Sequence, residues 1–302
     1  MAGSEIKSLH PWQVWLLAAR PKTLPAAASG VITATALAWH DGYFRPGPAL
    51  AALGVALLLQ IGSNLANDVF DFERGADTAA RQGPMRVTQA RLLTPAQVKM
   101  GMGAVFGLAA ILGLYLASVS SWNVIWLGLA AIVAAIAYTG GPFPLGYYGL
   151  GDLFVFVFFG LAAVAGTYYV QAGAVSAAAW WMSAPIGLIV TAILVVNNLR
   201  DIVTDRAAGK QTLAVRLGER GARVEYLLCL GVAYLLLPVL IWRGLLQVTA
   251  LLAWGSLWVA WPVTQTVLNK QGKALNAALG GTGQIALTYS VLFLVGLLLA
   301  RA

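Results

Sequence analysis

Long apolar stretches separated by short polar segments dominate the chain. Runs of roughly 18 to 25 apolar residues can cross a bilayer as helices, and about nine such runs are present. They lie at about 23–40, 49–67, 101–118, 122–140, 152–171, 179–198, 224–242, 246–267 and 277–300. The pattern predicts an all-α, polytopic membrane protein, with about nine transmembrane helices in one bundle and a single domain over residues 1–302. The stretch 9–19 is too short to span and is expected to lie at the membrane interface.

Composition excludes a soluble globular protein. Apolar residues make up 60% of the 302 residues and charged residues only 10%, with a mean hydropathy of +0.78. Both values are far from those of water-soluble domains. The one cysteine, Cys229, lies within an apolar run, so an intrachain disulfide and a multi-cysteine metal site are also excluded.

Basic residues are distributed unevenly between the two sides of the predicted bundle. All but three of the 19 Lys and Arg residues fall on one side; the exceptions are Arg45, Arg243 and Arg301. The positive-inside rule makes the basic side cytoplasmic, together with the N-terminus and the loops 68–100, 140–151 and 199–223. The net charge of +8 therefore reflects topology, and a nucleic-acid partner is not expected.

Acidic residues gather where two of the apolar runs end. The chain has 11 acidic residues, and seven lie in these two segments or at another helix mouth: Asp68, Asp71, Glu73, Asp77, Asp152, Asp201 and Asp205. Carboxylates at the edge of a bilayer are costly and usually functional. At spacings of three or four residues, the pairs Asp68/Asp71 and Asp201/Asp205 share a helix face if the helices continue.

Two facing pairs of carboxylates repel one another unless cations are present. One or two Mg²⁺ ions would neutralise them, together with Asp77, and leave coordination positions for phosphate oxygens. Flanking bases supply the other half of a diphosphate site, because Arg binds phosphate in a bidentate manner and Lys acts as a point charge. The candidate bases are Arg74, Arg81, Arg86, Arg200, Arg206 and Lys210.

The membrane setting narrows the substrate class. A site at the cytoplasmic mouth of an apolar bundle can hold a charged head group while a long tail lies between helices, and a polyprenyl diphosphate has this shape. Loss of diphosphate leaves an allylic carbocation, which aromatic faces stabilise. The aromatic residues near the inner loop or the following helix are Tyr138, Phe143, Tyr147, Tyr148 and Tyr168.

Several of these segments together resemble the UbiA superfamily of intramembrane aromatic prenyltransferases. The Gly209–Gly218 segment is similar to the branch that acts on 1,4-dihydroxy-2-naphthoate. The matching segments extend from the first span to the start of the seventh. They are Arg20-Pro-Lys-Thr-Leu-Pro25, Ser63-Asn-Leu-Ala-Asn-Asp-Val-Phe-Asp71, Gly75-Ala-Asp77, Gly83-Pro84, Tyr138-Thr139, Gly146-Tyr-Tyr-Gly-Leu-Gly-Asp152, Asn197-Asn-Leu-Arg-Asp201 and Asp205-Arg-Ala-Ala-Gly-Lys-Gln-Thr-Leu-Ala-Val-Arg-Leu-Gly218.

The resemblance implies Mg²⁺-dependent transfer of a polyprenyl chain from polyprenyl diphosphate to 1,4-dihydroxy-2-naphthoate, with loss of carboxylate, to give a demethylmenaquinol. It implies one Mg²⁺ on Asp68, Asp71 and Asp77 and another on Asp201 and Asp205. Asn64 would complete the first cluster, and Arg20 or Lys22 with Tyr138 would contact diphosphate. The remaining residues expected to bind substrate are Arg81, Arg86, Tyr148, Asn197, Arg200 and Lys210.

Three questions remain open at this point. Asp152 either caps the helix that it opens or acts catalytically near the aromatic acceptor. A prenyltransferase of the same superfamily could use another aromatic acceptor, or a phytyl or shorter tail. A transporter of a lipid phosphate or an ion is the alternative from another class, although transporters tend to place ionisable residues near the bilayer midplane.

Overall fold

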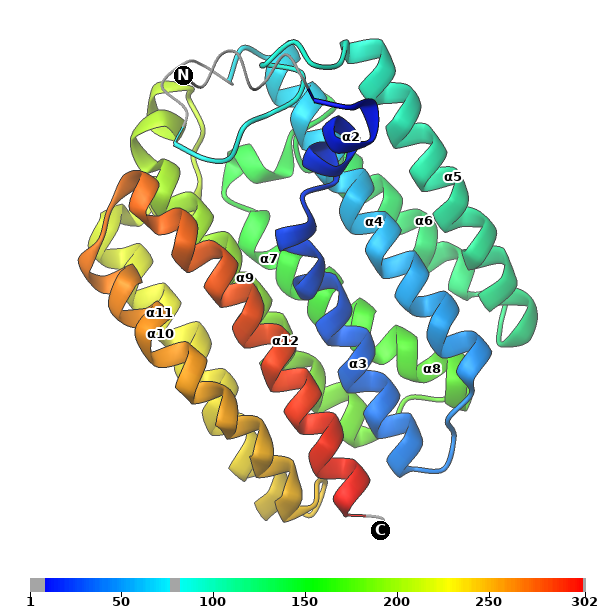
Figure 1. Cartoon of the computed structure of the whole chain (residues 1–302). Helices are drawn as coiled ribbons and strands as arrows, with labels where there is room; N and C mark the ends of the chain where they lie inside the picture. The colour runs from blue at the N-terminus through cyan, green and yellow to red at the C-terminus, as the bar shows by residue number, and fades with distance from the viewer. Residues whose placement is uncertain (1–8, 77–81, 301–302) are drawn as a thin grey trace.

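The computed structural model describes residues 9–76 and 82–300, and the regular structure in this part of the chain is helical. The helices lie side by side in one bundle, with α2 near one end and the C-terminus at the other (Figure 1). The longer ones are α3 (Leu24–His40), α4 (Pro46–Glu73), α5 (Pro95–Val119), α6 (Val124–Ala137), α9 (Ala177–Ala207), α10 (Leu213–Trp242), α11 (Leu257–Asn269) and α12 (Leu275–Leu299).

Shorter helical segments complete the bundle. The predicted fifth span is one continuous run of α7 (Gly151–Val155), the π-helical η4 (Phe156–Ala165) and α8 (Gly166–Ala172). The predicted eighth span is η5 (Val248–Ser256) followed by α11. The remaining short segments are α2 (Pro11–Ala19), η2 (Pro21–Thr23), η3 (Leu145–Tyr148) and η6 (Gly272–Ala274).

Each of the predicted spans coincides with a helix or with consecutive helical segments. Within residues 9–76 and 82–300, six of these are long and apolar enough to cross a membrane. They are α4, α5, Gly151–Ala172, α9, α10 and Gly272–Leu299. The prediction of a multi-pass membrane protein is therefore confirmed. The count of nine spans stays a prediction, because α6 is a shorter apolar helix and α3 has 17 residues.

Two helices continue beyond the bounds that hydropathy indicates. α4 runs to Glu73 and α9 to Ala207, so both acid clusters lie on the last turns of helices. The loops are correspondingly shorter than expected, because α5 already begins at Pro95 and α10 at Leu213. Hydropathy does not predict the polar ends of α4 and α9, because a helix can continue through polar residues after it leaves the apolar layer.

Local signals explain where the key helices begin. Ser176 accepts a hydrogen bond from the Ala179 amide at the start of α9, and Thr212 caps α10 through the Val215 amide. α9 then passes through the middle of the bundle, where its buried side chains contribute to the largest apolar cluster, together with α3, α10 and α12. This packing fixes the helix that carries the second acid cluster.

The segment expected at the membrane interface forms a short helix of its own, and its position at the interface stays a prediction. α2 lies near one end of the bundle (Figure 1), and it exposes Trp12 and Leu16 while it buries Val14 and Ala18. Its last carbonyl, on Ala19, accepts a hydrogen bond from Nδ2 of Asn64 at 2.9 Å. The surface helix is thereby connected to the first polar cluster of the bundle.

Candidate functional site

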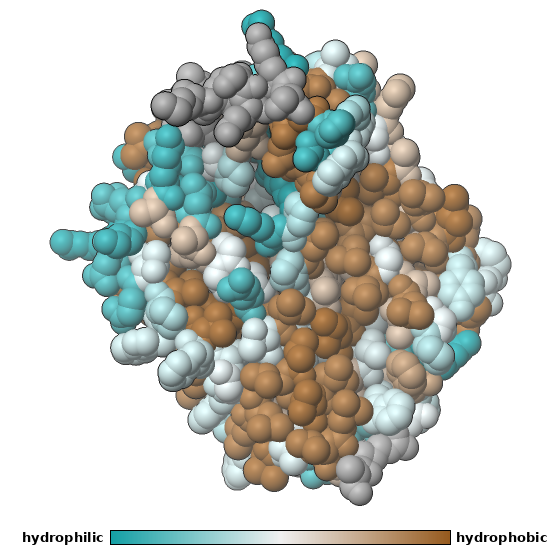
Figure 2. Space-filling view, in the orientation of Figure 1, coloured by the Kyte–Doolittle hydropathy of each residue, from teal (hydrophilic) through white to brown (hydrophobic). Residues whose placement is uncertain are grey.

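A cavity of about 540 Å³ lies between α3, α4, α5, α6, η4 and α9. Most of its wall is apolar, but one end is lined by charged and amide side chains. Figure 2 shows a hollow edged by hydrophilic residues toward the end of the molecule that carries α2. The charged and amide residues at the cavity are Arg20, Gln60, Asn64, Asn67, Asp71, Arg86, Asn197, Asn198, Asp201, Asp205 and Lys210.

Asp71 is the most heavily contacted carboxylate at the polar end. Its Oδ2 lies 2.6 Å from NH2 of Arg86, and its Oδ1 accepts a hydrogen bond of 2.5 Å from the hydroxyl of Tyr147. Only 2% of Asp71 is exposed. A buried carboxylate needs such partners, because desolvation of a lone charge is costly. The structure therefore brings Asp71 and Arg86 together, as the sequence predicted.

Asp68 has different surroundings. Its Oδ2 accepts the backbone N–H of Val87 and its Oδ1 that of Thr88, both at 3.0 Å, and the residue does not line the cavity. Both oxygens thus hold the segment after Arg86 against α4. This geometry favours a structural role for Asp68 over the predicted role as a metal ligand.

Asn67 occupies the place on the cavity wall that sequence reasoning gave to Asp68. Its Oδ1 accepts a 3.0 Å hydrogen bond from the hydroxyl of Thr139, and its backbone carbonyl accepts one from Arg86. The sequence could have indicated this position, because Asn67 precedes Asp71 by four residues and residues so spaced share a helix face.

The second cluster is organised around Arg200. Its guanidinium donates to both carboxylate oxygens of Asp201, at 2.9 and 2.5 Å, and to Oδ1 of Asn197 at 2.8 Å. A fourth bond, of 2.9 Å, reaches Oδ1 of Asn276 on α12. Arg200 itself is buried away from the cavity, whereas Asp201 and Asn197 line it. Arg200 therefore orients the cavity-lining side chains from behind.

Lys210 joins the two clusters. Its Nζ lies 3.5 Å from Oδ1 of Asp71 and 3.5 Å from Oδ1 of Asp205. It also lies over the ring of Tyr147, 4.5 Å from the centroid. The two helix ends that the sequence predicted to face each other are thus connected through one ammonium group.

Tyr147 supplies a phenol at the polar end. Burial, followed by the charge and hydrogen bond of Asp71, raises the pKa of Tyr147 well above its ordinary value. This phenol therefore stays protonated at neutral pH and donates its hydrogen bond to Asp71. Tyr138 also lines the cavity.

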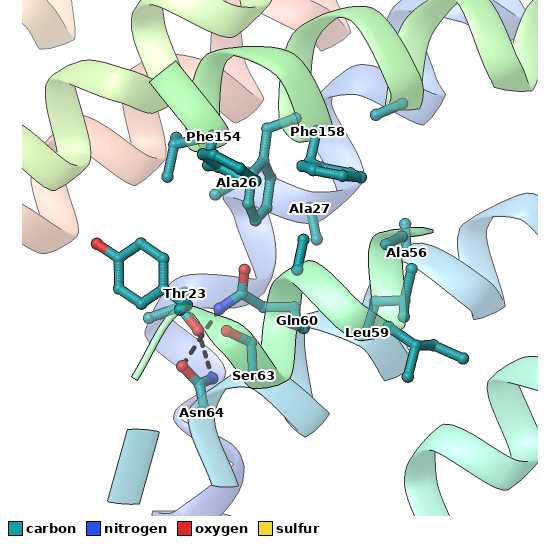
Figure 3. A pocket seen from close by; sticks show the side chains of 18 of the residues that line it. Thr23, Ala26, Ala27, Ala56, Leu59, Gln60, Ser63, Asn64, Phe154 and Phe158 are labelled. Atoms are coloured by element: carbon teal, nitrogen blue, oxygen red, sulfur yellow. Dashed lines mark hydrogen bonds between the residues drawn. The ribbon is translucent and has the colours of Figure 1, made fainter. Parts of the chain in front are cut away.

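Asn64 lies where the polar end of the cavity meets the apolar part. Its amide donates to the hydroxyl of Thr23 at 2.9 Å, and its Oδ1 accepts from Nε2 of Gln60 at 3.2 Å (Figure 3). Across the cavity, Phe154 and Phe158 stack with their ring centroids 6.1 Å apart. These two rings were not among the predicted aromatic residues, although they follow the inner loop closely.

Besides Asp68 and the candidate bases Arg74 and Arg206, four residues predicted to bind substrate or act in catalysis do not line this cavity. Arg200 lies behind it, and Lys22 lines a separate cavity with Asn276 and Gln284. Tyr148 is 49% exposed and pairs with Phe143 instead. Asp152, the fourth, is treated next. Two further predicted residues, Asp77 and Arg81, lie outside the described residues.

Asp152 fits neither of its two predicted roles directly. The residue that caps α7 is Leu150, and Asp152 is the second residue of the helix without a side-chain capping bond, so the capping interpretation is wrong. The carboxylate does not line the cavity; among the described residues its buried oxygens accept no hydrogen bond. It lies next to Gly151, which packs against the hydroxyl of Tyr138. Its catalytic role stays a prediction.

The donor set at the polar end suits a hard cation. Asp71, Asp201 and Asp205 offer carboxylate oxygens and Asn67 offers an amide oxygen, which are the ligands that Mg²⁺ prefers. In the described ranges, no three His, Cys, Asp or Glu side chains are close enough to hold a metal ion by themselves. This also fits Mg²⁺, which commonly uses one or two carboxylates and completes its shell with water and phosphate.

Fold and site together define an all-helical membrane protein with an apolar cavity that ends in paired carboxylates and bases. Comparison with known sequences is specific: the model of the UbiA prenyltransferase family matches residues 27–280. The chain belongs to this family.

Two relatives are named 1,4-dihydroxy-2-naphthoate octaprenyltransferase. The protein from Escherichia coli (strain K12) is 40% identical over 305 residues, which covers 96% of each chain. The protein from Mycobacterium tuberculosis (strain H37Rv) is 45% identical over 228 residues, or 75% of this chain and 77% of that protein. A solved structure of a UbiA homolog from Archaeoglobus fulgidus, bound to GPP and Mg²⁺, is similar with a TM-score of 0.63. The superposition covers 94% of this chain and 99% of that one at 14% identity, and it supports the fold.

Proposed function

We propose that the protein transfers a polyprenyl chain from polyprenyl diphosphate to 1,4-dihydroxy-2-naphthoate, with Mg²⁺ and with loss of carboxylate, to give a demethylmenaquinol. The observation that carries this proposal is the polar end of the cavity. There the carboxylates of α4 and α9 meet Lys210 at the mouth of an apolar space. The names of the Escherichia coli and Mycobacterium tuberculosis relatives support the acceptor.

One Mg²⁺ would be held by Asp71, with Asn67 beside it, and a second by Asp201 and Asp205. Asp77 remains a further candidate ligand. When bound, the metal supplies positive charge for the departing diphosphate. The structure from Archaeoglobus fulgidus, which holds GPP and Mg²⁺ in the same fold, supports this use of the site.

Bases of this chain position the diphosphate. Arg20, Arg86 and Lys210 line the polar end, and each can donate charge-assisted hydrogen bonds to phosphate oxygens. Because the phosphate oxygens are held at this end, the C–O bond that joins the diphosphate to prenyl C1 lies near the aromatic rings deeper in the cavity. Departure of diphosphate takes the electron pair of this bond and leaves an allylic cation on the prenyl C1.

The aromatic faces of Phe154 and Phe158 lie beside the path from diphosphate to tail, where they stabilise such a cation. The ring carbon of the acceptor that carries the carboxylate attacks prenyl C1 and forms the new C–C bond. The C–CO₂ bond then breaks, its electron pair returns to the ring, and CO₂ leaves. The apolar walls exclude water, which would otherwise capture the cation.

We place this polar end on the cytoplasmic face. Lys22, Lys99, Arg220 and Lys270 lie near the same end of the helices as the acid clusters, and basic residues mark the cytoplasmic side. The nine-span topology is part of the proposal, because an odd count keeps the basic loops together.

The direct test uses membranes that contain the protein, Mg²⁺, 1,4-dihydroxy-2-naphthoate and prenyl diphosphates of different length, with products read by mass spectrometry. A prenylated product that lacks the mass of the carboxylate is expected. Chelation of Mg²⁺ and the Asp201→Asn variant serve as matched controls, and both should abolish this product. Prenylation of another aromatic acceptor alone, such as 4-hydroxybenzoate, would contradict the proposed acceptor but not the reaction class.

A further inference from the structure

A second cavity, of about 440 Å³, lies apart from the candidate site. Its walls come from η2, α3, α11 and α12, and α12 packs against both α3 and α11 (Figure 1). The residues that line it are different from those that line the first cavity. The second cavity is therefore a separate space with a chemistry of its own.

This lining combines one positive charge with apolar walls. Among the described residues, Lys22 is the charged residue of the lining, and no acidic side chain joins it there. The ammonium of Lys22 forms no ion pair within the described ranges, and the residue is exposed. Pro25 and Val263 add apolar surface. The cavity therefore suits a ligand with an anionic group at one end and hydrocarbon at the other.

An unpaired amide lies deeper in the second cavity. Gln284 lies about 12 Å beyond Asn276 along α12, at the rise of an α-helix. Its side chain is exposed on a segment long and apolar enough to cross a membrane, and it forms no hydrogen bond within the described part of the chain. Hydrocarbon would leave this amide unsatisfied, which is costly. A polar group of a bound lipid would satisfy it.

The position of the second cavity matches the surface of a bilayer. It lies at the end of α12 that follows Lys270 and Lys273, which are both exposed. Basic residues beside a membrane attract the anionic head groups of lipids. From this end the lining extends about 12 Å inward, which covers the head-group layer of one leaflet and the start of the hydrocarbon. A phospholipid therefore fits the cavity better than a wholly soluble anion.

The wall between the two cavities carries groups of the candidate site. Within and beside η2, Lys22 faces the second cavity, while Arg20 and Thr23 line the first. Asn276 lines the second cavity, and its Oδ1 accepts the 2.9 Å hydrogen bond from Arg200, which orients the second acid cluster. A ligand in the second cavity therefore contacts the same segments that hold these groups in place.

We propose that the second cavity binds an anionic membrane phospholipid, with its phosphate at Lys22 and its glycerol esters near Gln284, and that this lipid stabilises the wall shared with the first cavity. The inference goes beyond the proposed function, because it requires a membrane-embedded chain but no prenyl transfer. Gly280 leaves room for the lipid, since a Cβ atom there would meet no atom within 4 Å although the residue lines the cavity.

Lipid binding can be measured on the purified full chain without prenyl substrates. The delipidated protein is titrated with phosphatidylglycerol or phosphatidylcholine in detergent at physiological salt. Bound lipid is read by native mass spectrometry and stability by thermal unfolding. Phosphatidylglycerol should bind in preference and raise Tm, because a ligand of the folded state stabilises it. Equal binding of phosphatidylcholine would overturn the anionic site. Equal stabilisation by inorganic phosphate would overturn the lipid as its source.

The variant Lys22→Gln removes the charge that faces the phosphate. It should weaken phosphatidylglycerol binding about tenfold or more, as expected for loss of a charge-assisted hydrogen bond. Lys270→Gln is the matched control: it removes the same charge at the same end but does not line either cavity, so its effect should be screened to about twofold or less. Unchanged lipid binding in Lys22→Gln, with weaker binding of a prenyl diphosphate analogue, would overturn the proposal and assign Lys22 to the diphosphate.

The variant Gly280→Leu tests the same cavity by filling it. It should lower phosphatidylglycerol binding by about tenfold while all charges remain, because a side chain that occupies an apolar pocket excludes a ligand of matching size. Gly231→Leu on α10 is its control, since it also has open space around it and does not line either cavity. Thermal unfolding without lipid confirms that each variant is folded. Wild-type lipid binding in Gly280→Leu would overturn the site, whatever the outcome for prenyl transfer.

Discussion

The ammonium of Lys210 lies 3.5 Å from a carboxylate oxygen of Asp71 on α4 and 3.5 Å from one of Asp205 on α9. This single side chain occupies the space between two acid clusters that are remote in sequence. It is therefore the first group that a bound diphosphate and its metal must rearrange. An ammonium on a flexible stem is suited to this, since it can turn from carboxylate to phosphate oxygen.

Replacing Lys210 with Met should weaken binding of a non-hydrolysable prenyl diphosphate analogue. A hydrogen bond to a charged group contributes about 1.5–3 kcal/mol. That corresponds to a roughly ten- to hundredfold rise in Kd. Equilibrium titration in Mg²⁺ gives the value. Lys99→Met is the control, because Lys99 pairs with Glu73 on the surface and does not line the cavity. An equal affinity in Lys210→Met and wild type would remove Lys210 from the substrate site.

Asp71 and Asp68 should respond differently to the same change. Asp71→Asn or Asp201→Asn should abolish turnover and raise the Mg²⁺ concentration needed for substrate binding, because amides replace carboxylate ligands poorly. Asp68→Asn should instead lower thermal stability by about 1–3 kcal/mol, since its amide group would face a backbone N–H. Its Mg²⁺ dependence should remain near that of the wild type. Thermal unfolding and Mg²⁺ titration of the three variants separate a ligand from a structural carboxylate, and a shifted Mg²⁺ dependence in Asp68→Asn would restore the predicted ligand role.

Tyr147→Phe should reduce turnover about tenfold, because the charged carboxylate of Asp71 loses the hydrogen bond that the Tyr147 hydroxyl donates. The raised pKa of Tyr147 keeps its phenol protonated, so the wild-type pH profile should show no loss from this group up to about pH 10. The neighbouring Tyr148→Phe is a matched control, since Tyr148 is exposed and outside the cavity. An alkaline inflection near pH 10 that disappears in Tyr147→Phe would contradict the assignment.

Orientation can be tested with single cysteines in a Cys229→Ala background. A cysteine at Ala207, the last residue of α9, should resist a membrane-impermeant thiol reagent added to intact cells. A cysteine at Asn123, which precedes α6 at the opposite end, should be labelled under the same conditions. Both positions are exposed in the structure, so accessibility of the side chain itself does not limit the comparison. The reverse pattern would place the acid clusters outside the cell.

Apolar run length and residue type were sufficient to predict the helices and the two acid-bearing helix ends. They could not distinguish Asp68 from Asp71, because the two are three residues apart and lie near the same helix face. The distinction arises from tertiary contacts: the Val87 and Thr88 amides approach Asp68, while Tyr147 and Arg86 approach Asp71.

The Arg86–Asp71 pair also bears on how the protein is made. The two residues are 15 positions apart, so they emerge from the ribosome within moments of each other, long before Lys210. Asp71 can therefore acquire a counter-charge while the N-terminal helices are still being inserted, which lowers the cost of placing a carboxylate at the membrane edge. Lys210 joins only after α9 is in place. The Arg86→Ala variant should therefore be inserted less efficiently and degraded early, so that the amount of protein in the membrane falls in addition to any loss of turnover.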